Sequence, residues 1–121
     1  MTLYYLGSPY SKYPNGINAA FRDVAQLAAR LLMKGYIVYS PIAHTHPIAI
    51  YGGINPLDHK IWLPFDQKMI VVCDAMIVAR MDGWKDSFGI GEEIKMFEAA
   101  GKPIYDVDPA TLEIIAREKN K

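Results

Sequence analysis

The chain has 121 residues, enough for one domain with a single hydrophobic core. Hydrophobic residues make up 51% of the sequence, which is too many for an intrinsically disordered chain. The 13 Lys and Arg residues balance the 13 Asp and Glu residues, so no basic surface argues for a polymeric nucleic acid as partner. The single cysteine, Cys73, excludes an internal disulfide and a cysteine-rich zinc site, and we expect a buried core thiol.

Targeting signals and domain boundaries are not evident in the sequence. The N-terminus lacks the basic segment and the long apolar stretch of a signal peptide, and no apolar run is long enough to cross a bilayer. We therefore expect a cytoplasmic protein with no membrane partner. No internal repeat or low-complexity segment divides the chain, so residues 1–121 are expected to form one domain.

The first third of the chain predicts a strand, a helix and a second strand. Residues 3–6 are apolar and aromatic and are followed by Gly-Ser-Pro, which is typical of a buried strand. Apolar residues recur at helical spacing over residues 20–32, and Gly35 is the expected C-cap. Residues 36–39 predict the second strand. A β-α-β unit of this kind favours a parallel sheet.

The middle of the chain contains the longest segment that we interpret as irregular, residues 40–55. It carries two histidines, two prolines and a Gly-Gly pair, and long loops in small domains are often functional. Asn55-Pro56 predicts the start of a helix that Pro64 breaks or kinks, so a fresh helix is expected over about residues 64–72. The apolar run over residues 75–79 predicts the third strand.

The last third predicts a helix over residues 89–100, a strand over residues 103–105 and a final helix that opens at Asp108-Pro109. From residue 117 onward we expect a solvated tail. The order of elements predicts an α/β domain of doubly wound, flavodoxin-like type, with about four parallel strands in the order 2-1-3-4 and helices on both faces. Such folds bind ligands at the carboxyl ends of the strands, here where the first and third strands diverge.

Two adjacent glutamates follow the Gly-rich loop that leads out of the third strand. Because a helix advances about 100° per residue, Glu93 lies roughly 40° from the centre of the buried stripe, near Phe97, whereas Glu92 lies roughly 140° away. Glu92 therefore faces water, where the helix dipole favours it. An inward carboxylate needs a partner or a cavity, so Glu93 either binds a loop N–H or a lysine, or faces a pocket at the strand ends.

Other polar residues are expected near the same edge of the sheet. Asp66 is expected in the first turn of the helix that begins at Pro64, where it either stabilises the helix terminus or faces the pocket. Gly7 allows a ligand to approach the backbone, and Ser8 offers a hydroxyl. Tyr5 either donates a hydrogen bond to an acid of the site or is a core tyrosine with a satisfied hydroxyl.

The histidines and tryptophans leave alternatives open. His44 and His46 alternate, so an extended segment would place both rings on one face. They either hold a metal together with Asp58 or His59, or serve in packing or ligand contact, and we favour the second reading and expect neither a metal nor a cofactor. Trp84 either stacks on a base or anchors its loop in the core.

Three segments, in their order and spacing, resemble the nucleoside 2-deoxyribosyltransferase superfamily, which includes the 2'-deoxynucleoside 5'-phosphate N-hydrolases. They are Tyr5-Leu-Gly-Ser-Pro9, Asp66 eight residues before Asp74, and Ser87-Phe-Gly-Ile-Gly-Glu-Glu93. The segment over residues 83–90, together with Gly-Lys-Pro at residues 101–103, is similar to a branch of short bacterial and phage proteins. The likeness spans residues 4–105.

This resemblance implies roles for individual residues. Glu93 matches the nucleophile that attacks the anomeric carbon, Asp66 matches the acid that protonates or orients the departing base, and Tyr5 matches the tyrosine that holds the nucleophile. Six further residues are candidates for binding the substrate: Gly7, Ser8, Ser87, Gly89, His46 and Trp84. The first three of these match positions around a 5'-phosphate.

The resemblance implies an enzyme that cleaves or transfers the N-glycosidic bond of a (deoxy)nucleoside or nucleoside 5'-monophosphate, and a homo-oligomer, because members of the superfamily commonly pair to complete the site. Water as acceptor gives a hydrolase and a second base gives a transferase, between which the sequence does not choose. The alternatives are a non-catalytic nucleotide-binding or sensing module and a metal-dependent phosphohydrolase that uses His44, His46 and Asp58. The loop over residues 80–86 is longer than in the nucleotide hydrolases, and their basic residues after the first strand are not reproduced. The base, the sugar and the need for a 5'-phosphate therefore stay open.

Overall fold

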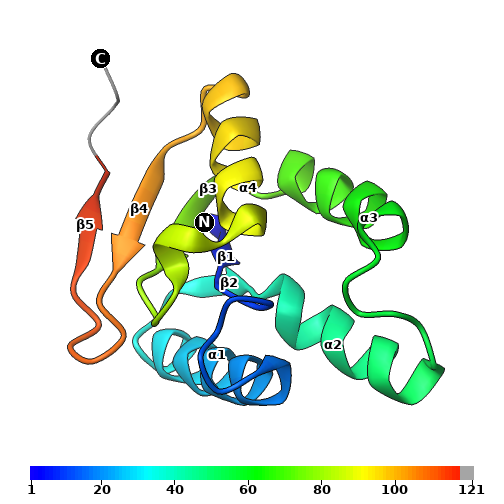
Figure 1. Cartoon of the computed structure of the whole chain (residues 1–121). Helices are drawn as coiled ribbons and strands as arrows, with labels where there is room; N and C mark the ends of the chain where they lie inside the picture. The colour runs from blue at the N-terminus through cyan, green and yellow to red at the C-terminus, as the bar shows by residue number, and fades with distance from the viewer. Residues whose placement is uncertain (118–121) are drawn as a thin grey trace.

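The strands of the computed structural model, which describes residues 1–117, form one sheet in the order β2-β1-β3-β4-β5 (Figure 1). They are β1 (Leu3–Gly7), β2 (Ile37–Tyr39), β3 (Ala75–Ala79), β4 (Ile104–Val107) and β5 (Ile114–Ala116). The pairs β1–β2, β1–β3 and β3–β4 are parallel, and β4–β5 is antiparallel. The predicted α/β class is confirmed, but the sheet is mixed and has five strands rather than about four.

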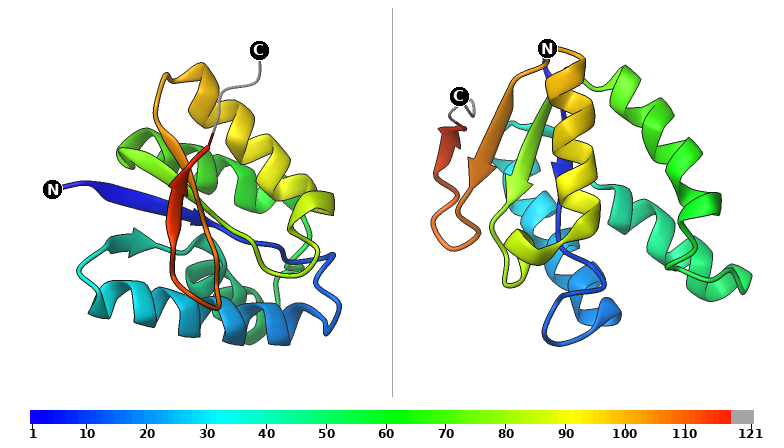
Figure 2. Two further views of the ribbon diagram at one scale, coloured as in Figure 1. Left: turned by 90° about the vertical axis from the view of Figure 1, so that its left-hand side faces the viewer. Right: turned by 45° about the horizontal axis from the view of Figure 1, so that its top comes forward.

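Helices lie on both faces of this sheet (Figure 2). They are α1 (Ile17–Met33), α2 (Pro41–Gly52), α3 (His59–Val72) and α4 (Phe88–Ala99), with a 3-10 turn, η1 (Trp84–Asp86), before α4. Side chains of α1 pack on one face, whereas α3 and α4 pack on the other. No helix within residues 1–117 combines the length and the apolar character that crossing a membrane requires.

The alternation of side chains along β1 divides the core into two layers. Leu6 packs on the α1 side, with Leu27 and Ile77, whereas Tyr5 packs on the α4 side, with Phe97. All five residues of β3 are buried, because this central strand is covered on both faces. Tyr5 is therefore a core residue whose hydroxyl reaches toward the helices that follow β2 and β3.

The expectation of an irregular segment over residues 40–55 is wrong, because α2 (Pro41–Gly52) covers most of it. Ser40 is the N-cap, and its hydroxyl oxygen accepts a hydrogen bond of 3.1 Å from the Ala43 N–H. Pro41 occupies the first turn, where a missing N–H costs nothing. Gly53 ends the helix in the left-handed conformation, with φ of 70°. Local capping thus outweighs the turn-forming composition.

The predicted helix start at Asn55 and the predicted break at Pro64 are also wrong. Asp58 is the N-cap of α3, which continues through Pro64 to Val72. The oxygen of Asn55 instead accepts a hydrogen bond of 2.9 Å from a backbone N–H two residues later and closes a turn. Proline removes one helical hydrogen bond but does not end the helix here. Asp66 consequently lies in the middle of α3 and not in a first turn.

The C-terminal segment does not form the helix predicted at Asp108. A hairpin turn follows β4, and the Asp108 N–H donates to the Glu113 carbonyl at 3.0 Å, which leads the chain into β5. Arg117 is not part of a solvated tail, because its guanidinium lies 2.7 Å from the Asp106 carboxylate. The rest of the predicted tail, residues 118–121, lies outside the described residues.

Candidate active site

Four side chains meet beside the carboxyl ends of β1 and β2, on the face that α3 and α4 cover. We call them the acid–tyrosine cluster: Tyr5, Tyr39, Asp66 and Glu93. Tyr5 and Tyr39 are directly opposite in the parallel β1–β2 pair, so their side chains point to the same face. Their ring centroids lie 5.9 Å apart. Neighbouring strands thus supply the two hydroxyls, and two different helices supply the two acids.

Glu93 reaches the cluster because α4 begins at a well-defined point. The Ser87 hydroxyl oxygen accepts a hydrogen bond of 3.2 Å from the Ile90 N–H and so caps the helix. Glu93 lies on the inward side, as the helical spacing predicts, and its carboxylate accepts a hydrogen bond from the Tyr5 hydroxyl. This hydrogen bond directly links two of the three residues that the sequence analysis names as catalytic, and the third, Asp66, lies in the same cluster.

Gly7 leaves the space that the Glu93 carboxylate occupies. A Cβ atom built on Gly7 would lie 3.3 Å from the Glu93 Oε1 and 2.6 Å from the Met76 Cε. The first distance is tight and the second is a clash, so a larger residue here would displace these neighbours. The sequence analysis explains Gly7 by the approach of a ligand. The structure adds a second reason, which is the approach of the protein's own carboxylate.

Burial changes the proton affinity of both acids. It raises the pKa of Glu93 to about 8, an effect that the Tyr5 hydrogen bond opposes and the nearby Asp66 charge reinforces. It also raises the pKa of Asp66 to about 6. Among the described residues, the Asp66 Oδ1 and the Tyr39 hydroxyl are buried without a hydrogen-bond partner. Two acids of unequal pKa, one of them unpartnered, are the arrangement that proton transfer requires.

The two tyrosines respond to the same charges. The pKa of Tyr5 lies far above its ordinary value, chiefly through burial and then through the charges of Glu93 and Asp66. The pKa of Tyr39 is raised by burial and next by the Asp66 charge. Both hydroxyls therefore keep their protons and act as hydrogen-bond donors. Only Tyr5 has an acceptor in the described part of the chain.

The candidates for substrate binding divide into two groups. Gly7 and Ser8 continue from Tyr5 along the first strand and its turn, and the Ser8 hydroxyl is buried without a partner among residues 1–117. Ser87 and Gly89 belong to the beginning of the helix that carries Glu93, although the Ser87 oxygen already serves as the helix cap. These four residues adjoin the cluster in sequence and through their secondary-structure elements.

His46 lies apart from the cluster and packs between α1 and α2. Its Nδ1 shares a hydrogen bond with the Tyr10 hydroxyl, and its Nε2 lies 3.0 Å from the Asn18 Oδ1. Its ring stacks on Phe21 with centroids 4.7 Å apart. Both nitrogens are therefore engaged, which favours packing over ligand contact. Within residues 1–117, no group of three or more His, Cys, Asp or Glu side chains is placed to hold a metal ion.

Trp84 anchors the loop between β3 and α4. The guanidinium groups of Arg80 and Arg117 lie over its ring, 5.3 and 5.5 Å from the centroid. Both arginines also bind the buried Asp106 carboxylate, at 2.8 and 2.7 Å. These contacts favour the loop-anchor alternative, and they hold in place the segment that feeds into the helix of Glu93.

Tyr39 is the residue of the cluster that sequence reasoning misses. It stands directly before Ser40-Pro41, as Tyr5 stands shortly before Ser8-Pro9. This repeated tyrosine before a serine–proline turn is the signal that could have identified it. The signal is informative only once β1 and β2 are known to pair with Tyr5 opposite Tyr39. The sequence alone does not show this pairing.

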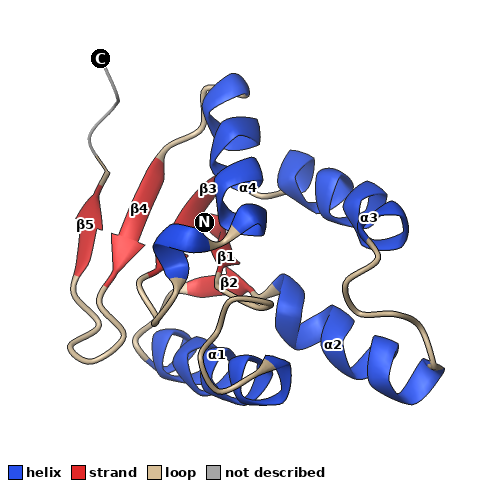
Figure 3. Ribbon diagram, in the orientation of Figure 1, coloured by secondary structure: helices blue, strands red, loops and turns tan. Residues whose placement is uncertain are grey.

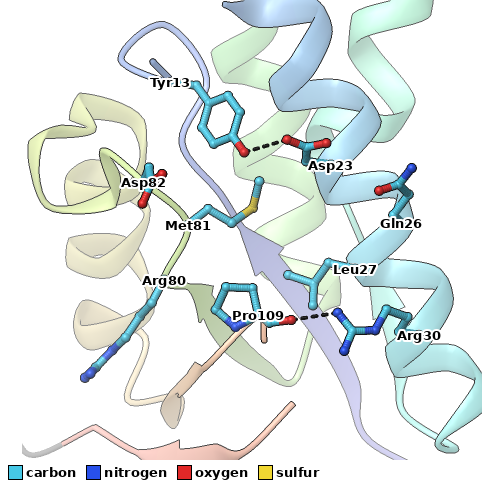
Figure 4. A pocket seen from close by; sticks show the side chains of 9 residues that line it. All are labelled: Tyr13, Asp23, Gln26, Leu27, Arg30, Arg80, Met81, Asp82 and Pro109. Carbon is cyan, nitrogen blue, oxygen red and sulfur yellow. Dashed lines mark hydrogen bonds between the residues drawn. The ribbon is translucent and has the colours of Figure 1, made fainter. Parts of the chain in front are cut away.

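A hollow of about 270 Å³ lies on the opposite face, between α1 and the segments that follow β3 and β4 (Figure 4). Across it the Tyr13 hydroxyl donates to the Asp23 carboxylate at 2.6 Å, and the Arg30 guanidinium donates to the Pro109 carbonyl at 2.7 Å. None of the residues of the acid–tyrosine cluster lines this hollow. Its polar groups are largely used to tie loops to α1.

The fold and the cluster define an α/β protein with a partly buried pair of acids at the carboxyl edge of parallel strands. Residues 2–108 match a family described as a domain of unknown function, DUF1937, and the chain belongs to this family. A search of curated proteins found no match. The family match covers the four parallel strands and all the helices, whereas β5 lies beyond it.

Proposed function

We propose that the protein cleaves or transfers the N-glycosidic bond of a nucleoside or nucleoside 5'-monophosphate, with Glu93 as nucleophile. One observation carries the proposal: the Glu93 carboxylate is bound by Tyr5, lies beside Gly7 and is coupled to the unpartnered Asp66. The cluster stands at the sheet edge where α/β proteins bind ligands. The same residues carry the resemblance to nucleoside 2-deoxyribosyltransferases, and the strand order supports a flavodoxin-like, doubly wound type.

The proposed reaction has two steps. In the first, an oxygen of ionised Glu93 forms a bond to the anomeric carbon while the bond from that carbon to the base nitrogen breaks. The electron pair of that bond stays on the base, and Asp66 donates a proton to it. In the second step water, or the N–H nitrogen of a second base, attacks the same carbon, passes its proton to the Asp66 carboxylate and releases Glu93 as a carboxylate. Tyr5 holds the carboxylate in place through both steps.

The test is release of free base from a panel of nucleosides, 2'-deoxynucleosides and their monophosphates. The protein is expected to release base from at least one of them, and Glu93→Gln is expected to lower the rate at least about 1,000-fold, because it removes the nucleophile. Glu92→Gln is the matched control, since Glu92 only pairs with Lys95 at 3.0 Å on the surface. Failure of the whole panel, with ligand binding intact in Glu93→Gln, would exclude the enzyme.

A second candidate function is a non-catalytic module that binds or senses nucleotides. It is favoured by one observation: with a pKa of about 8, Glu93 is mostly protonated at neutral pH, and a protonated acid is a poor nucleophile. A sensing module would gain thermal stability from a nucleotide without forming product, so the same panel separates the two functions.

We also propose a homo-oligomer, supported by the apolar side chains that α2, α3 and the start of α4 expose. Figure 3 shows α2 and α3 projecting beyond the sheet on the same side. Ten large apolar side chains there are exposed: Ile48, Ile50, Tyr51, Leu57, Ile61, Leu63, Phe65, Val71, Val72 and Phe88. Covered together they would bury on the order of 800 Å² per chain, as one partner of a specific interface does. α2 carries no charged residue, so a second copy meets no like-charge repulsion there.

A cytoplasmic location is part of the same proposal. Nucleosides and their monophosphates are intracellular compounds, and the free thiol of the buried Cys73 suits a reducing compartment. Burial raises the pKa of this thiol to about 11, so it is a packing residue rather than a nucleophile.

A further inference from the structure

The Tyr39 hydroxyl is the group of the acid–tyrosine cluster that the proposed reaction leaves unexplained. It is buried and has no hydrogen-bond partner among residues 1–117. A buried hydroxyl without a partner costs roughly 1–3 kcal/mol, so such groups are rare in folded proteins. A phenylalanine would fill the same space without this cost. The hydroxyl is therefore free to bind a ligand.

Its position restricts what that partner is. Tyr39 stands opposite Tyr5 in the β1–β2 pair, with ring centroids 5.9 Å apart, and Tyr5 holds the Glu93 carboxylate. The Tyr39 hydroxyl also lies within electrostatic reach of the Asp66 and Glu93 carboxylates. It is thus beside the point where an anomeric carbon would be attacked. The carbon bonded to the anomeric carbon is C2', and a ribose carries a hydroxyl there.

We propose that the Tyr39 hydroxyl hydrogen-bonds to the 2'-hydroxyl of the substrate, and that the protein acts on ribosyl substrates in preference to 2'-deoxyribosyl ones. This inference rests on the proposed function. A 2'-deoxy sugar would leave Tyr39 unpartnered, and a site built to bind a hydroxyl discriminates strongly against the analogue that lacks it. Hydrogen bonds to this hydroxyl also strengthen as the oxocarbenium-like transition state forms.

Substrate access requires α3 to move, because the Tyr39 hydroxyl and the Asp66 Oδ1 are buried. The helix is suited to such a movement. Ile70, near its C-terminal end, is its only fully buried residue. The segment before Asp66 is largely exposed and packs through single contacts such as the stacking of Phe65 on His44, with centroids 5.2 Å apart. An outward shift of this end would open the space between Asp66 and Tyr39.

The test compares kcat/KM on matched pairs of ribonucleosides and 2'-deoxyribonucleosides, and on their monophosphates, for the native protein and for Tyr39→Phe. The native protein is expected to favour the ribo substrate at least about 10-fold. Tyr39→Phe is expected to lower kcat/KM about 10- to 100-fold on the ribo substrate and less than about 3-fold on the deoxy substrate. Tyr4→Phe is the control, because Tyr4 packs in the other core layer, against Tyr36.

Two results would overturn the inference while leaving the proposed function intact. One is equal or faster release of base from the 2'-deoxy substrate, and the other is an equal loss on both sugars in Tyr39→Phe. If base is released from neither the ribo nor the 2'-deoxy substrate, the proposed function is overturned. In that case, thermal stabilisation of the protein by each nucleoside tests whether Tyr39 contacts the 2'-hydroxyl. Stabilisation by adenosine and not by 2'-deoxyadenosine, lost in Tyr39→Phe, supports the contact. Its absence overturns it.

Discussion

At the scale of single residues, the position of the Glu93 carboxylate depends on the absence of a side chain at Gly7. Replacement of Gly7 by alanine is expected to displace the Met76 methyl group, which can move, and the Glu93 carboxylate, which is fixed by Tyr5. We expect Gly7→Ala to fold with a loss of about 1–2 kcal/mol in the free energy of unfolding and to lose more than about 10-fold in base release. Urea denaturation and the base-release assay measure the two effects.

The matched control is Gly91→Ala, because a Cβ atom at Gly91 meets nothing within 4 Å and the residue is exposed on α4. Alanine is expected to stabilise the helix there by up to about 1 kcal/mol without affecting catalysis. Equal activity of Gly7→Ala and the native protein would show that the space beside β1 does not position the carboxylate.

The pH dependence of the rate is also set by single residues. The proposed reaction uses an ionised Glu93 and a protonated Asp66, so it requires that the pair hold one proton between them. With pKa values of about 6 and 8, this state is lost below about pH 6, when a second proton binds, and above about pH 8, when the last proton leaves. We expect a bell-shaped profile of kcat/KM with its maximum near neutral pH.

Removal of the Tyr5 hydroxyl tests whether the ionisation of Glu93 sets the alkaline limb of the pH profile. The hydrogen bond from Tyr5 lowers the pKa of Glu93, so Tyr5→Phe is expected to raise that pKa further and to move the limb above pH 8. In molecules with one proton shared between Glu93 and Asp66, that proton then lies on Asp66 less often. The maximal rate is therefore expected to fall. An unchanged limb in Tyr5→Phe would mean that another group controls it.

At the scale of elements, α3 is held mainly at its C-terminal end. The Lys102 ammonium donates to the carbonyls of Ile70, Val71 and Cys73 at 2.9, 2.9 and 2.7 Å. A cation at a helix C-terminus is favourable, and hydrogen bonds from a charged donor are among the stronger ones. These contacts fix the C-terminal end of α3, the helix that carries Asp66. They do not reach its first turns.

Replacement of Lys102 by methionine is expected to lower the free energy of unfolding by about 2–3 kcal/mol, because three carbonyls lose their donor. Lys95→Met is the control and is expected to change it by less than about 0.5 kcal/mol, since Lys95 is 76% exposed and forms only a surface ion pair. Chemical denaturation of both variants measures the difference. A loss in Lys102→Met as small as in the control would contradict the account of α3.

The sequence predicts the elements whose local signals agree. β1, β3, α1 and α4 have clear periodicity and clear ends, and all four are found. The segment over residues 40–55 carries two histidines, two prolines and a Gly-Gly pair, so composition alone indicates a loop. The N-cap Ser40 and the left-handed Gly53 favour a helix, but they outweigh the composition only in the folded protein, where α2 packs against other elements. β5 is missed because Asp108-Pro109 suits a turn as well as a helix start.

The candidate site is predictable where its residues share one strand–loop–helix unit. Glu93 and Gly7 each follow from their own segment. Tyr39 is recognised only from the pairing of two strands that 29 residues separate, and the partners of His46 and Trp84 come from distant parts of the chain. Contacts of this kind depend on tertiary structure, which single-sequence patterns do not encode.

At the scale of the whole molecule, the apolar surface of α2 and α3 predicts self-association. Val71 and Tyr51 are 69% and 91% exposed on this surface. The native protein is expected to be a dimer or a larger oligomer by light scattering after size-exclusion chromatography. Val71→Glu is expected to weaken association at least about 100-fold, because it places an unpaired charge in a dry interface.

Met33→Glu is the matched control, because Met33 is also exposed, at 89%, but lies at the end of α1, away from the α2 and α3 surface. A native protein that stays monomeric at every accessible concentration would show that these side chains do not mediate self-association. Equal behaviour of the two glutamate variants would place the interface elsewhere.

The guanidinium groups of Arg80 and Arg117 lie over Trp84, and Arg117 thereby connects the last strand to the loop before α4. Arg117 follows β5, outside the family match, whereas Trp84 precedes the helix that carries Glu93. A chain shortened to residue 108 would keep every parallel strand and yet remove one side of this stacked arrangement. We expect such a chain to keep its fold better than the proposed base release, so the C-terminal strand is a place at which mutation alters the proposed activity without touching Glu93 or Asp66.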